Sequence, residues 1–388
     1  MQCDVIVVGG GPAGLAFALG LAQARLDVVL VDRQPLAALS DPAEDGREIA
    51  LTHRSVAALR ALGAWAHIAP ADVAPLRSAQ VYDGDSPFAL AFDAAGTPND
   101  RLGHLVPNHH IRRALFAATA GQAGLTLLAA ARVTGVATSA NASTVTLADG
   151  AAIRARLLVG ADSRFSEVRA RLGIAARTHR LGKAMLVARV SHDLDHRGVA
   201  TEWFGHGRTL ALLPLAGRMS SVVLTLTEDA IARLAVSGPA SLAHALTRYS
   251  NAMLGTMRMA GAAHSYPLAT VWSHHFAATR AALIGDAAVG MHPVTAHGFN
   301  LGLRSAVDLA TRVARAAKCG QDIGGARLLR GYESGHRKAA APLFAATEII
   351  TGLYTDDRVP ARVARPILLR AAARVSPVRA GVTRMLMR

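Results

Sequence analysis

The sequence predicts an α/β protein in which a Rossmann-like domain contains an inserted antiparallel β-sheet and is followed by a C-terminal helical segment. Three observations predict this fold class. A glycine motif separates a buried strand from a helix near the N-terminus, residues 180–275 read as strands separated by Gly, Asp and Arg turns, and a second strand–turn–helix unit spans residues 284–306. Because the two α/β units flank the strand-rich region, we expect that region to be an insertion.

The N-terminal stretch CDVIVVGGGPAGLAFALGLAQARLDVVLVDR carries the strongest pattern. A continuous β-branched run at residues 5–8 predicts a strand buried on both faces. Gly9, Gly11 and Gly14 follow in GxGxxG spacing, and then come a helix and a second strand that ends on Asp32. In this context the motif predicts a dinucleotide-binding loop rather than a simple turn, and it serves NAD and FAD alike.

Each residue of this motif has a physical use beside a pyrophosphate. Gly9 permits the tight turn, Gly11 lets the pyrophosphate approach the backbone, and Gly14 lets helix and strand pack closely. The helix N-terminus offers free N–H groups and the positive end of its dipole. Asp32 can accept hydrogen bonds from ribose hydroxyls.

Three further segments carry candidate ligand contacts. Arg47 lies just before a predicted helix, where it either neutralises a phosphate or is a surface charge. Asn108 lies near the start of another helix, either as its N-cap or as a ligand contact. Asp162 lies at the end of a predicted strand, where open α/β sheets present ligand-binding groups.

The segment IGDAAVGMHPVTAHGFNLGLRSA, residues 284–306, has the same strand–turn–helix character. A short buried strand ends on Gly285 and Asp286, and a Met-His-Pro break follows. A helix then begins near Gly298, and its N-terminus is a second place where negative charge is stabilised.

Composition excludes several classes of protein. Of 388 residues, 51% are apolar and 18% charged, so the chain buries a large core and is not disordered. Two cysteines without metal or disulfide spacing fit a reducing cytoplasm. The net charge of +15 indicates either an anionic partner or an evenly charged, arginine-rich surface. With 4% aromatic residues and no stacking pattern, we predict no nucleic-acid partner.

Residues 5–24 lack charge and are long enough to span a bilayer. The Gly-Gly-Gly-Pro sequence at 9–12 divides them, and the cationic start of a signal peptide is missing. We therefore expect a buried strand and a packed helix here, with no transmembrane segment and no export.

In this order, the motifs resemble those of single-component flavoprotein aromatic hydroxylases, the para-hydroxybenzoate hydroxylase class. The glycine motif, the segment DSRFSEVR and the Gly285–Asp286 pair carry the resemblance, which covers about residues 3–375. The segments GREIALTHRS and MHPVTAHGFNLGLRS look most like the branch that hydroxylates the ubiquinone ring, in its broad-regioselectivity bacterial members. The expected domains are a glutathione-reductase-type FAD-binding domain (1–75, 101–178 and 276–345), a substrate-domain excursion (76–100), a β-sheet substrate domain (179–275) and a basic helical segment (346–388).

The resemblance implies roles position by position. The glycine loop would hold the FAD pyrophosphate, Asp32 the adenosine ribose and Asp286 the ribityl chain. Pro293 would lie beside the isoalloxazine ring, and the amides of residues 298–300 would face its pyrimidine edge. The segment of Asp162 serves both FAD and NAD(P)H in the family. The predicted cofactor-binding residues are Gly9, Gly11, Pro12, Ala13, Gly14, Asp32, Arg33, Arg47, Asn108, Asp162, Gly285, Asp286, Pro293, Gly298, Phe299 and Asn300.

The chain departs from the family pattern at three positions. Ser163 stands where glycine is usual, in the segment used for NAD(P)H, and Ser305 stands where an acidic residue is common. His297 replaces a glutamine, so it tunes the flavin, touches substrate or is a tolerated change. The flavin carries the chemistry, so we predict no protein catalytic residue, with Pro293 and His297 as the candidates beside the ring.

The inserted sheet is expected to roof the substrate with its concave face. The implied reaction forms a flavin C4a-hydroperoxide from O₂, with NAD(P)H as the expected donor, and hydroxylates a hydrophobic polyprenylated phenol. The histidines lack zinc spacing, so we predict no metal. The residues assigned to the substrate cavity, each with core packing as the alternative, are Trp203, Phe204, Leu212 and Pro214.

The C-terminal tail is strongly basic. Residues 358–388 contain eight Arg and no acidic residue, and Arg358, Arg362 and Arg365 have helical spacing. The tail is therefore either a solvated helix or a basic helix that contacts anionic lipid or an accessory protein of ubiquinone synthesis. The second interpretation predicts a cytoplasmic protein that is peripheral at the inner membrane, and a homo-oligomer remains open.

Three other functions also fit the motifs. The first is a flavin hydroxylase of a small soluble phenol or secondary metabolite, which requires a closed polar pocket instead of a long apolar channel. The second is a non-catalytic flavoprotein scaffold in a biosynthetic complex. The third is a prenyl-lipid reductase, which oxygen consumption distinguishes from a hydroxylase.

Overall fold

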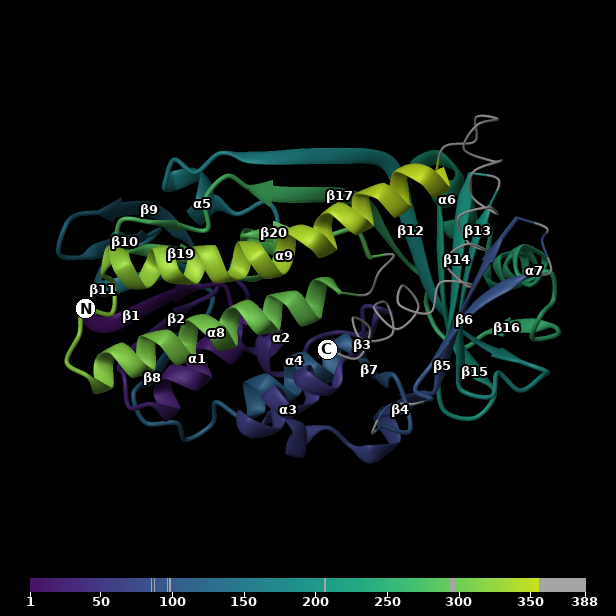
Figure 1. Ribbon diagram of the computed structural model, residues 1–388, viewed down its shortest axis with the longest axis horizontal. Coiled ribbons are helices and arrows are strands. Elements are labelled where there is room, and N and C mark those ends of the chain that lie inside the picture. The colour runs from purple at the N-terminus through teal and green to yellow at the C-terminus, as the bar shows by residue number, and fades with distance from the viewer. Residues whose placement is uncertain are drawn as a thin grey trace.

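The computed structural model describes residues 1–355 apart from residues 85, 87, 96, 98, 206 and 294–296. The predicted basic tail at 358–388 lies outside the described residues. Figure 1 shows a layered α/β body at one end of the molecule and a large β-sheet at the other. Within the described part, no helix is both long enough and apolar enough to cross a membrane.

The α/β body is built on a mostly parallel sheet. Alternate residues of its central strand enter two cores: Val5 and Val7 face the helices, whereas Ile6 and Val8 face a β-hairpin on the other side. Cover on both faces explains the unbroken apolar run in the sequence. The sheet order is β18 (Ala277–Ala278), β19 (Ala281–Leu283), β11 (Ala152–Gly160), β1 (Gln2–Val8), β2 (Val28–Val31) and β8 (Leu125–Leu128), with β10 (Ser143–Leu147) and β9 (Val133–Thr138) added beside β11.

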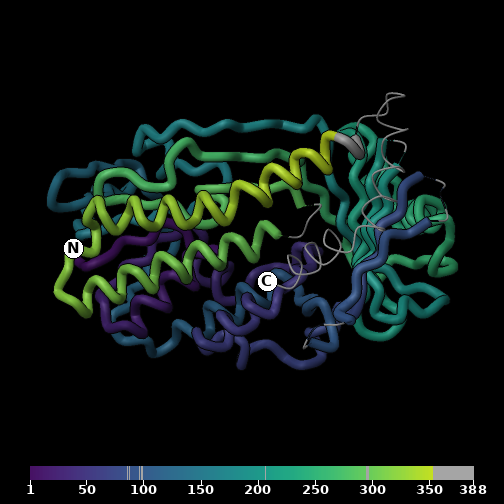
Figure 2. Tube along the Cα trace, in the orientation of Figure 1, coloured from purple at the N-terminus to yellow at the C-terminus, as the bar shows by residue number. Residues whose placement is uncertain are grey.

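Helices cover the first face of this sheet. Figures 1 and 2 show the two longest, α8 (Gly298–Lys318) and α9 (Ala326–Thr355), running side by side, and α9 continues toward the second body. The buried Tyr332 hydroxyl of α9 donates to the Leu283 carbonyl at 2.7 Å and so fixes α9 to β19. The other helices are α1 (Pro12–Gln23), α2 (Leu36–Ser40), α3 (His53–Ala61), α4 (Asn108–Ala117) and α5 (Glu167–Arg171).

The second body is a nine-stranded sheet that the chain enters three times, through residues 78–93, residues 176–273 and residues 289–290. Two of its strands are long and extend back over the α/β body (Figure 1). The order is β20 (Val289–Gly290), β17 (His264–Ser273), β12 (Ala176–His192), β15 (Met219–Thr227), β14 (Arg208–Pro214), β13 (Val199–Gly205), β5 (Ser78–Asp83) and β6 (Ala89–Asp93), with β16 (Met257–Met259) paired to β12. A three-stranded sheet of β3 (Glu48–Leu51), β7 (Gly103–Pro107) and β4 (Ala74–Leu76) lies between the bodies.

The two faces of the large sheet have different partners. Its outer face packs against α6 (Glu228–Ala235) and α7 (Pro239–Tyr249) through an aliphatic cluster. Its inner face meets β3 and the segment before it: Arg189 donates to the buried Glu48 carboxylate at 2.7 Å, and the Tyr266 hydroxyl donates to the Asp45 carbonyl at 2.8 Å. The inner face is therefore the one directed at the α/β body.

The ion pair between Arg189 and Glu48 should contribute strongly to stability. Burial raises the pKa of Glu48, although the positive charge of Arg189 opposes that effect. Arg189→Met leaves the buried carboxylate uncompensated, so we expect the free energy of unfolding to fall by about 3–5 kcal/mol at neutral pH. Chemical denaturation at saturating FAD measures the change.

The raised pKa of Glu48 also predicts how the stability difference between wild type and Arg189→Met changes with pH. When folding raises the pKa of a carboxyl group, the protein is more stable at low pH, where the group is neutral. The protein loses stability as the pH rises through the raised pKa. The difference between wild type and Arg189→Met should therefore grow as pH rises above 4.5, the ordinary pKa of Glu48. Arg258→Met, which removes an exposed pair with Asp193, is the control and should change little. A pH-independent difference would contradict the assignment.

Candidate functional site

The candidate site lies where four parallel strands end together. The register pairs Val8 with Val31 on one side and with Gly160 on the other, and Gly160 pairs with Leu283. The loops that follow these strands therefore emerge at one edge of the sheet. This is the edge at which open α/β sheets bind ligands.

The glycine turn after β1 is required by the packing of the backbone on itself. Gly9 has φ +112°, and a Cβ there would lie 2.4 Å from the Ala161 carbonyl oxygen. A Cβ at Gly14 would lie 1.8 Å from the Gly9 carbonyl oxygen. Gly11 differs, because a Cβ there would meet no protein atom within 4 Å. Gly11 therefore faces open space, as close approach of a ligand to the backbone requires.

The first turn of α1 is ready to receive an anion. Gly11 is its N-cap, so no side chain satisfies the first N–H groups, and Pro12 begins the helix. Ala13 lies beside Gly285, where an added Cβ would come within 3.0 Å of the Ala13 side chain. The end of β19 is thus packed directly against the start of α1.

Asp32 closes the glycine loop from the side. It is 8% exposed, and its carboxylate accepts hydrogen bonds from the Gly10 amide at 2.5 Å and the Gln34 amide at 2.7 Å. Each carboxylate oxygen has further acceptor capacity, so the ribose contact stays a prediction. The neighbouring Arg33 is exposed.

Arg47 and Asn108, which are 61 positions apart in sequence numbering, meet at one carboxylate. The Arg47 guanidinium pairs with Asp45 at 2.6 Å, and the Asn108 amide donates to the same oxygen at 2.7 Å. Burial acts to raise the pKa of Asp45, but the hydrogen bond and charge of Arg47 hold it below its ordinary value. Arg47 also lies 5.5 Å from the Tyr266 ring centroid. Sequence reasoning missed Asp45, although the Asp-Gly-Arg triplet carried the signal.

Asp162 is engaged in holding the start of α5. Its carboxylate accepts from the Ser166 hydroxyl at 2.5 Å and from the Val168 amide at 3.1 Å. Ser163 has φ +126°, a backbone region that favours glycine, and this explains the glycine expected there from the family pattern. Asp162 therefore has a structural role beside any contact to a nucleotide.

Asp286 faces a cation that the sequence did not indicate. The Arg164 guanidinium donates to Asp286 at 2.9 Å and to the Ala269 carbonyl at 2.9 Å. Behind it, the buried Ser305 hydroxyl accepts from the Gly285 amide at 3.0 Å. Ser305 thus holds the strand end that presents Asp286, and both partners were missed because they are distant in sequence.

The N-terminus of α8 is a second open helix end. His297 is its N-cap, is 6% exposed and makes no capping hydrogen bond with its side chain. A Cβ at Gly298 would meet no atom of the described residues within 4 Å. The first turn continues through Phe299, which is half-buried, and Asn300.

The Asn300 side chain joins α8 to the segment between β3 and α3. Its amide oxygen accepts from the Thr52 amide at 3.1 Å and from the Ser55 hydroxyl at 2.7 Å, and its nitrogen donates to the Ala50 carbonyl at 2.8 Å. The side chain of Asn300 is thus engaged within the protein, so the predicted flavin contact would be made by its backbone amide.

Pro293 is half-buried, and it follows a histidine that is neutral at physiological pH. Burial, together with the charges of Lys183 and Arg164, lowers the pKa of His292 to about 4. Residues 294–296, which complete the turn to α8, lie outside the described residues.

The four predicted substrate residues do not share a face of the large sheet. Phe204 lies on the inner face in a cluster with Leu90 and Phe92. Trp203 and Leu212 belong to the outer-face cluster beneath α6 and α7, and Pro214 follows Leu212 on that face. Strand alternation is the reason, because consecutive residues point to opposite faces. Trp203, Leu212 and Pro214 thus fit the alternative of core packing, and contact of any of the four residues with a substrate stays a prediction.

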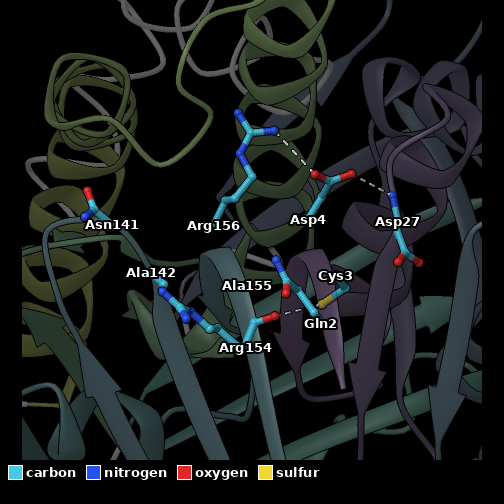
Figure 3. Close-up of a pocket in the computed structure, with 9 residues that line it drawn as sticks. All are labelled: Gln2, Cys3, Asp4, Asp27, Asn141, Ala142, Arg154, Ala155 and Arg156. Carbon is cyan, nitrogen blue, oxygen red and sulfur yellow. Dashed lines mark hydrogen bonds and ion pairs between the residues drawn. The ribbon is translucent and has the colours of Figure 1, made fainter.

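A surface pocket of about 440 Å³ lies away from these groups. Figure 3 shows it lined by Gln2, Cys3 and Asp4 at the start of β1 and by Arg154 on β11. These are the N-terminal ends of the strands, opposite the glycine turn, so this pocket is not the candidate cofactor site. Among residues that the structure describes, no group of three His, Cys, Asp or Glu is arranged to hold a metal.

Comparison with known proteins agrees with this geometry. The family model for the FAD binding domain matches residues 2–347. Ubiquinone hydroxylase UbiM of Neisseria meningitidis is 42% identical over 390 residues, covering 100% of this chain and 85% of that protein. Ubiquinone hydroxylase UbiL of Rhodospirillum rubrum is 35% identical over 376 residues, covering 97% and 87%.

Solved structures share the fold. The p-nitrophenol 4-monooxygenase PnpA from Pseudomonas putida aligns with a TM-score of 0.78 at 19% identity, covering 100% of this chain and 98% of that one. Klebsiella pneumoniae HpxO complexed with FAD and uric acid aligns with a TM-score of 0.77 at 20% identity, covering 100% and 97%. The predicted α/β fold with its inserted sheet is confirmed.

Two glycines of the motif should respond differently to alanine. Gly14→Ala places a Cβ against backbone that cannot yield, so we expect destabilisation at or beyond the upper end of the ~1–3 kcal/mol typical of overpacking. Gly11→Ala has an ordinary φ of −72° and open space. We expect it to fold normally but to lose bound FAD. Thermal unfolding of the apoprotein and the flavin-to-protein absorbance ratio measure the two effects. Full FAD occupancy in Gly11→Ala would contradict the assignment.

Proposed function

The chain belongs to the FAD binding domain family, and from this premise we propose that it hydroxylates the aromatic ring of a ubiquinone precursor. The observation that carries the proposal is similarity over nearly the whole chain to two proteins named ubiquinone hydroxylases. The substrate class follows from those relatives, since a ubiquinone precursor is a phenol with a polyprenyl chain.

The described residues fit FAD as the resident cofactor. The open space at Gly11 and at Gly298, each beside an uncapped helix N-terminus, suits a long ligand with a pyrophosphate at one point and an anionic ring edge at another. Asp32 would hold the ribose, and Asp286 with Arg164 would hold the ribityl chain. When bound, FAD supplies the activation of O₂ that ring hydroxylation requires.

The protein's own groups would stabilise the flavin, cover the substrate and exclude water. Amides at the start of α8 would stabilise negative charge at the flavin pyrimidine edge, because the helix dipole is positive there. The neutral His292 beside Pro293 would add no charge to that environment. The inner face of the large sheet would cover the substrate and exclude water.

Further partners complete the proposal. NAD(P)H is the proposed reductant, and Asp162 in its loop is the proposed contact. The Arg47 guanidinium, once released from Asp45, would contact the FAD phosphates, with Asn108 nearby. The protein would act in the cytoplasm at the inner membrane, within a ubiquinone-synthesis complex or as a homo-oligomer.

Complementation tests the function directly. The chain should restore ubiquinone in at least one bacterial strain lacking a ubiquinone ring hydroxylase, and quinone analysis of each strain should identify the carbon that is hydroxylated. Gly11→Ala is the matched control, since it should fold without retaining FAD. Failure in every strain, with the protein present and loaded with FAD, would overturn the proposal.

The basic tail should bring the protein to anionic membranes. Deleting residues 358–388 removes eight Arg, and each basic residue near an anionic surface is worth about 1 kcal/mol. We expect the full chain to cosediment with phosphatidylglycerol vesicles in low salt, and the truncated chain to remain in the supernatant. Phosphatidylcholine vesicles are the control. Equal binding of both chains would end this part of the proposal.

A further inference from the structure

Glu202 lies on the inner face of the large sheet, on the third strand from one edge. It lies on β13, where the register sets it beside Ala211 of β14 and Val81 of β5. The same row continues through Val223 and Val187, and Val187 lies 3.5 Å from the position of a Cβ on Gly46. Glu202 is therefore in a row of inner-face residues that passes beside Gly46, the residue before Arg47.

The surroundings of Glu202 are apolar. Its neighbours across the strands are Ala211 and Val81, and those along β13 on this face are Ala200 and Phe204. Within the described part of the chain, no residue forms a hydrogen bond or an ion pair with its carboxyl group. A partly desolvated carboxyl among apolar neighbours is costly when none of them pairs with it, so its presence needs an explanation.

The exposed surface of Glu202 and the effect of burial on its pKa together describe its environment. Glu202 keeps part of its surface accessible, yet burial alone raises its pKa to about 8. The carboxyl is therefore mostly protonated at pH 7 and close to its titration range. The described titratable or charged side chains on the same face, none of which accounts for this pKa, are Asp83 on β5, Lys183 and Arg189 on β12, and His264 and Tyr266 on β17.

We propose that Glu202 is the specificity-determining contact for the ring hydroxyl of the aromatic substrate. A phenol with a hydrocarbon chain presents an apolar body and one polar group. A carboxyl whose nearest neighbours on the sheet are apolar matches that chemistry, since binding sites for such ligands are mostly apolar with few polar groups that fix orientation. The inference rests on the proposed function and names the residue that orients its substrate.

The hydrogen bond also has a chemical consequence. The ionised carboxyl accepts the hydrogen bond of the phenolic hydroxyl, and this raises electron density in the ring that is to be hydroxylated. The protonated carboxyl has only its carbonyl oxygen as an acceptor, so the bond is weaker. Recognition of the hydroxyl should therefore strengthen as pH rises toward and past the pKa of Glu202.

Binding to the oxidised FAD holoenzyme tests the inference without turnover. The probes are a phenol bearing one prenyl unit and its methyl ether, and the readout is perturbation of the flavin absorbance. At a pH above the pKa of Glu202, wild type should prefer the phenol by about tenfold to a hundredfold, as expected for a hydrogen bond to a charged group. Glu202→Leu should lose that preference, and Glu202→Gln should keep part of it but without pH dependence.

The adjacent residue provides the matched control. Thr201 lies on the outer face, is buried, and donates to the Met253 sulfur at 3.9 Å, so Thr201→Val should keep the wild-type preference and pH dependence. The inference is overturned if Glu202→Leu retains FAD and still prefers the phenol, if Glu202→Gln retains the wild-type pH dependence, or if wild type itself does not discriminate. These outcomes are distinguishable from failure of the proposed function, which complementation decides.

Discussion

The close contact of backbone at the glycine turn is the constraint on which the rest of the site depends. Gly14 packs on the Gly9 carbonyl, and Gly9 packs on Ala161, so β1, β11 and the start of α1 are held at distances that no side chain permits. The parallel register then delivers Asp32 and Asp286 to the same edge. A local steric requirement therefore fixes the positions of groups that lie hundreds of residues apart.

Acidic side chains complete this arrangement by satisfying groups of the protein itself. Asp32 accepts a hydrogen bond from the Gly10 amide of the glycine loop, and Asp162 accepts one from the Val168 amide at the start of α5. Asp45 binds both Arg47 and Asn108. The carboxylates thereby shape the loops before any ligand arrives, and binding exchanges some of these contacts for contacts with the ligand. Substituting such an acid changes both the loop and its ligand contact, so Gly11, where an added Cβ would meet no described atom within 4 Å, separates the two effects better.

Sequence reasoning succeeded where the signal is local and failed where it depends on tertiary pairing. The strand–turn–helix units at Gly9 and Gly285 were predictable because their glycines and apolar runs serve neighbouring residues. Arg164 was not predictable as a partner, because its pairing with Asp286 spans 122 positions. The assignment of Trp203 and Phe204 to one cavity ignored a local rule, since adjacent strand residues cannot share a face. Glu202 was overlooked because a charged residue in a strand is ordinary until its face is known.

Strand β13 has two roles in the large sheet, one for the residues on its outer face and one for those on its inner face. Its outward residues, such as Thr201 and Trp203, pack against helices and other outer-face side chains, where apolar burial stabilises the insertion. Its inward residues face the α/β body, which meets this sheet through the buried pair of Glu48 and Arg189. A carboxyl that contributed only to stability would be better replaced by an apolar side chain at the same position. An acid on the inward side without a partner among the described residues is therefore best explained by a ligand that supplies its partner.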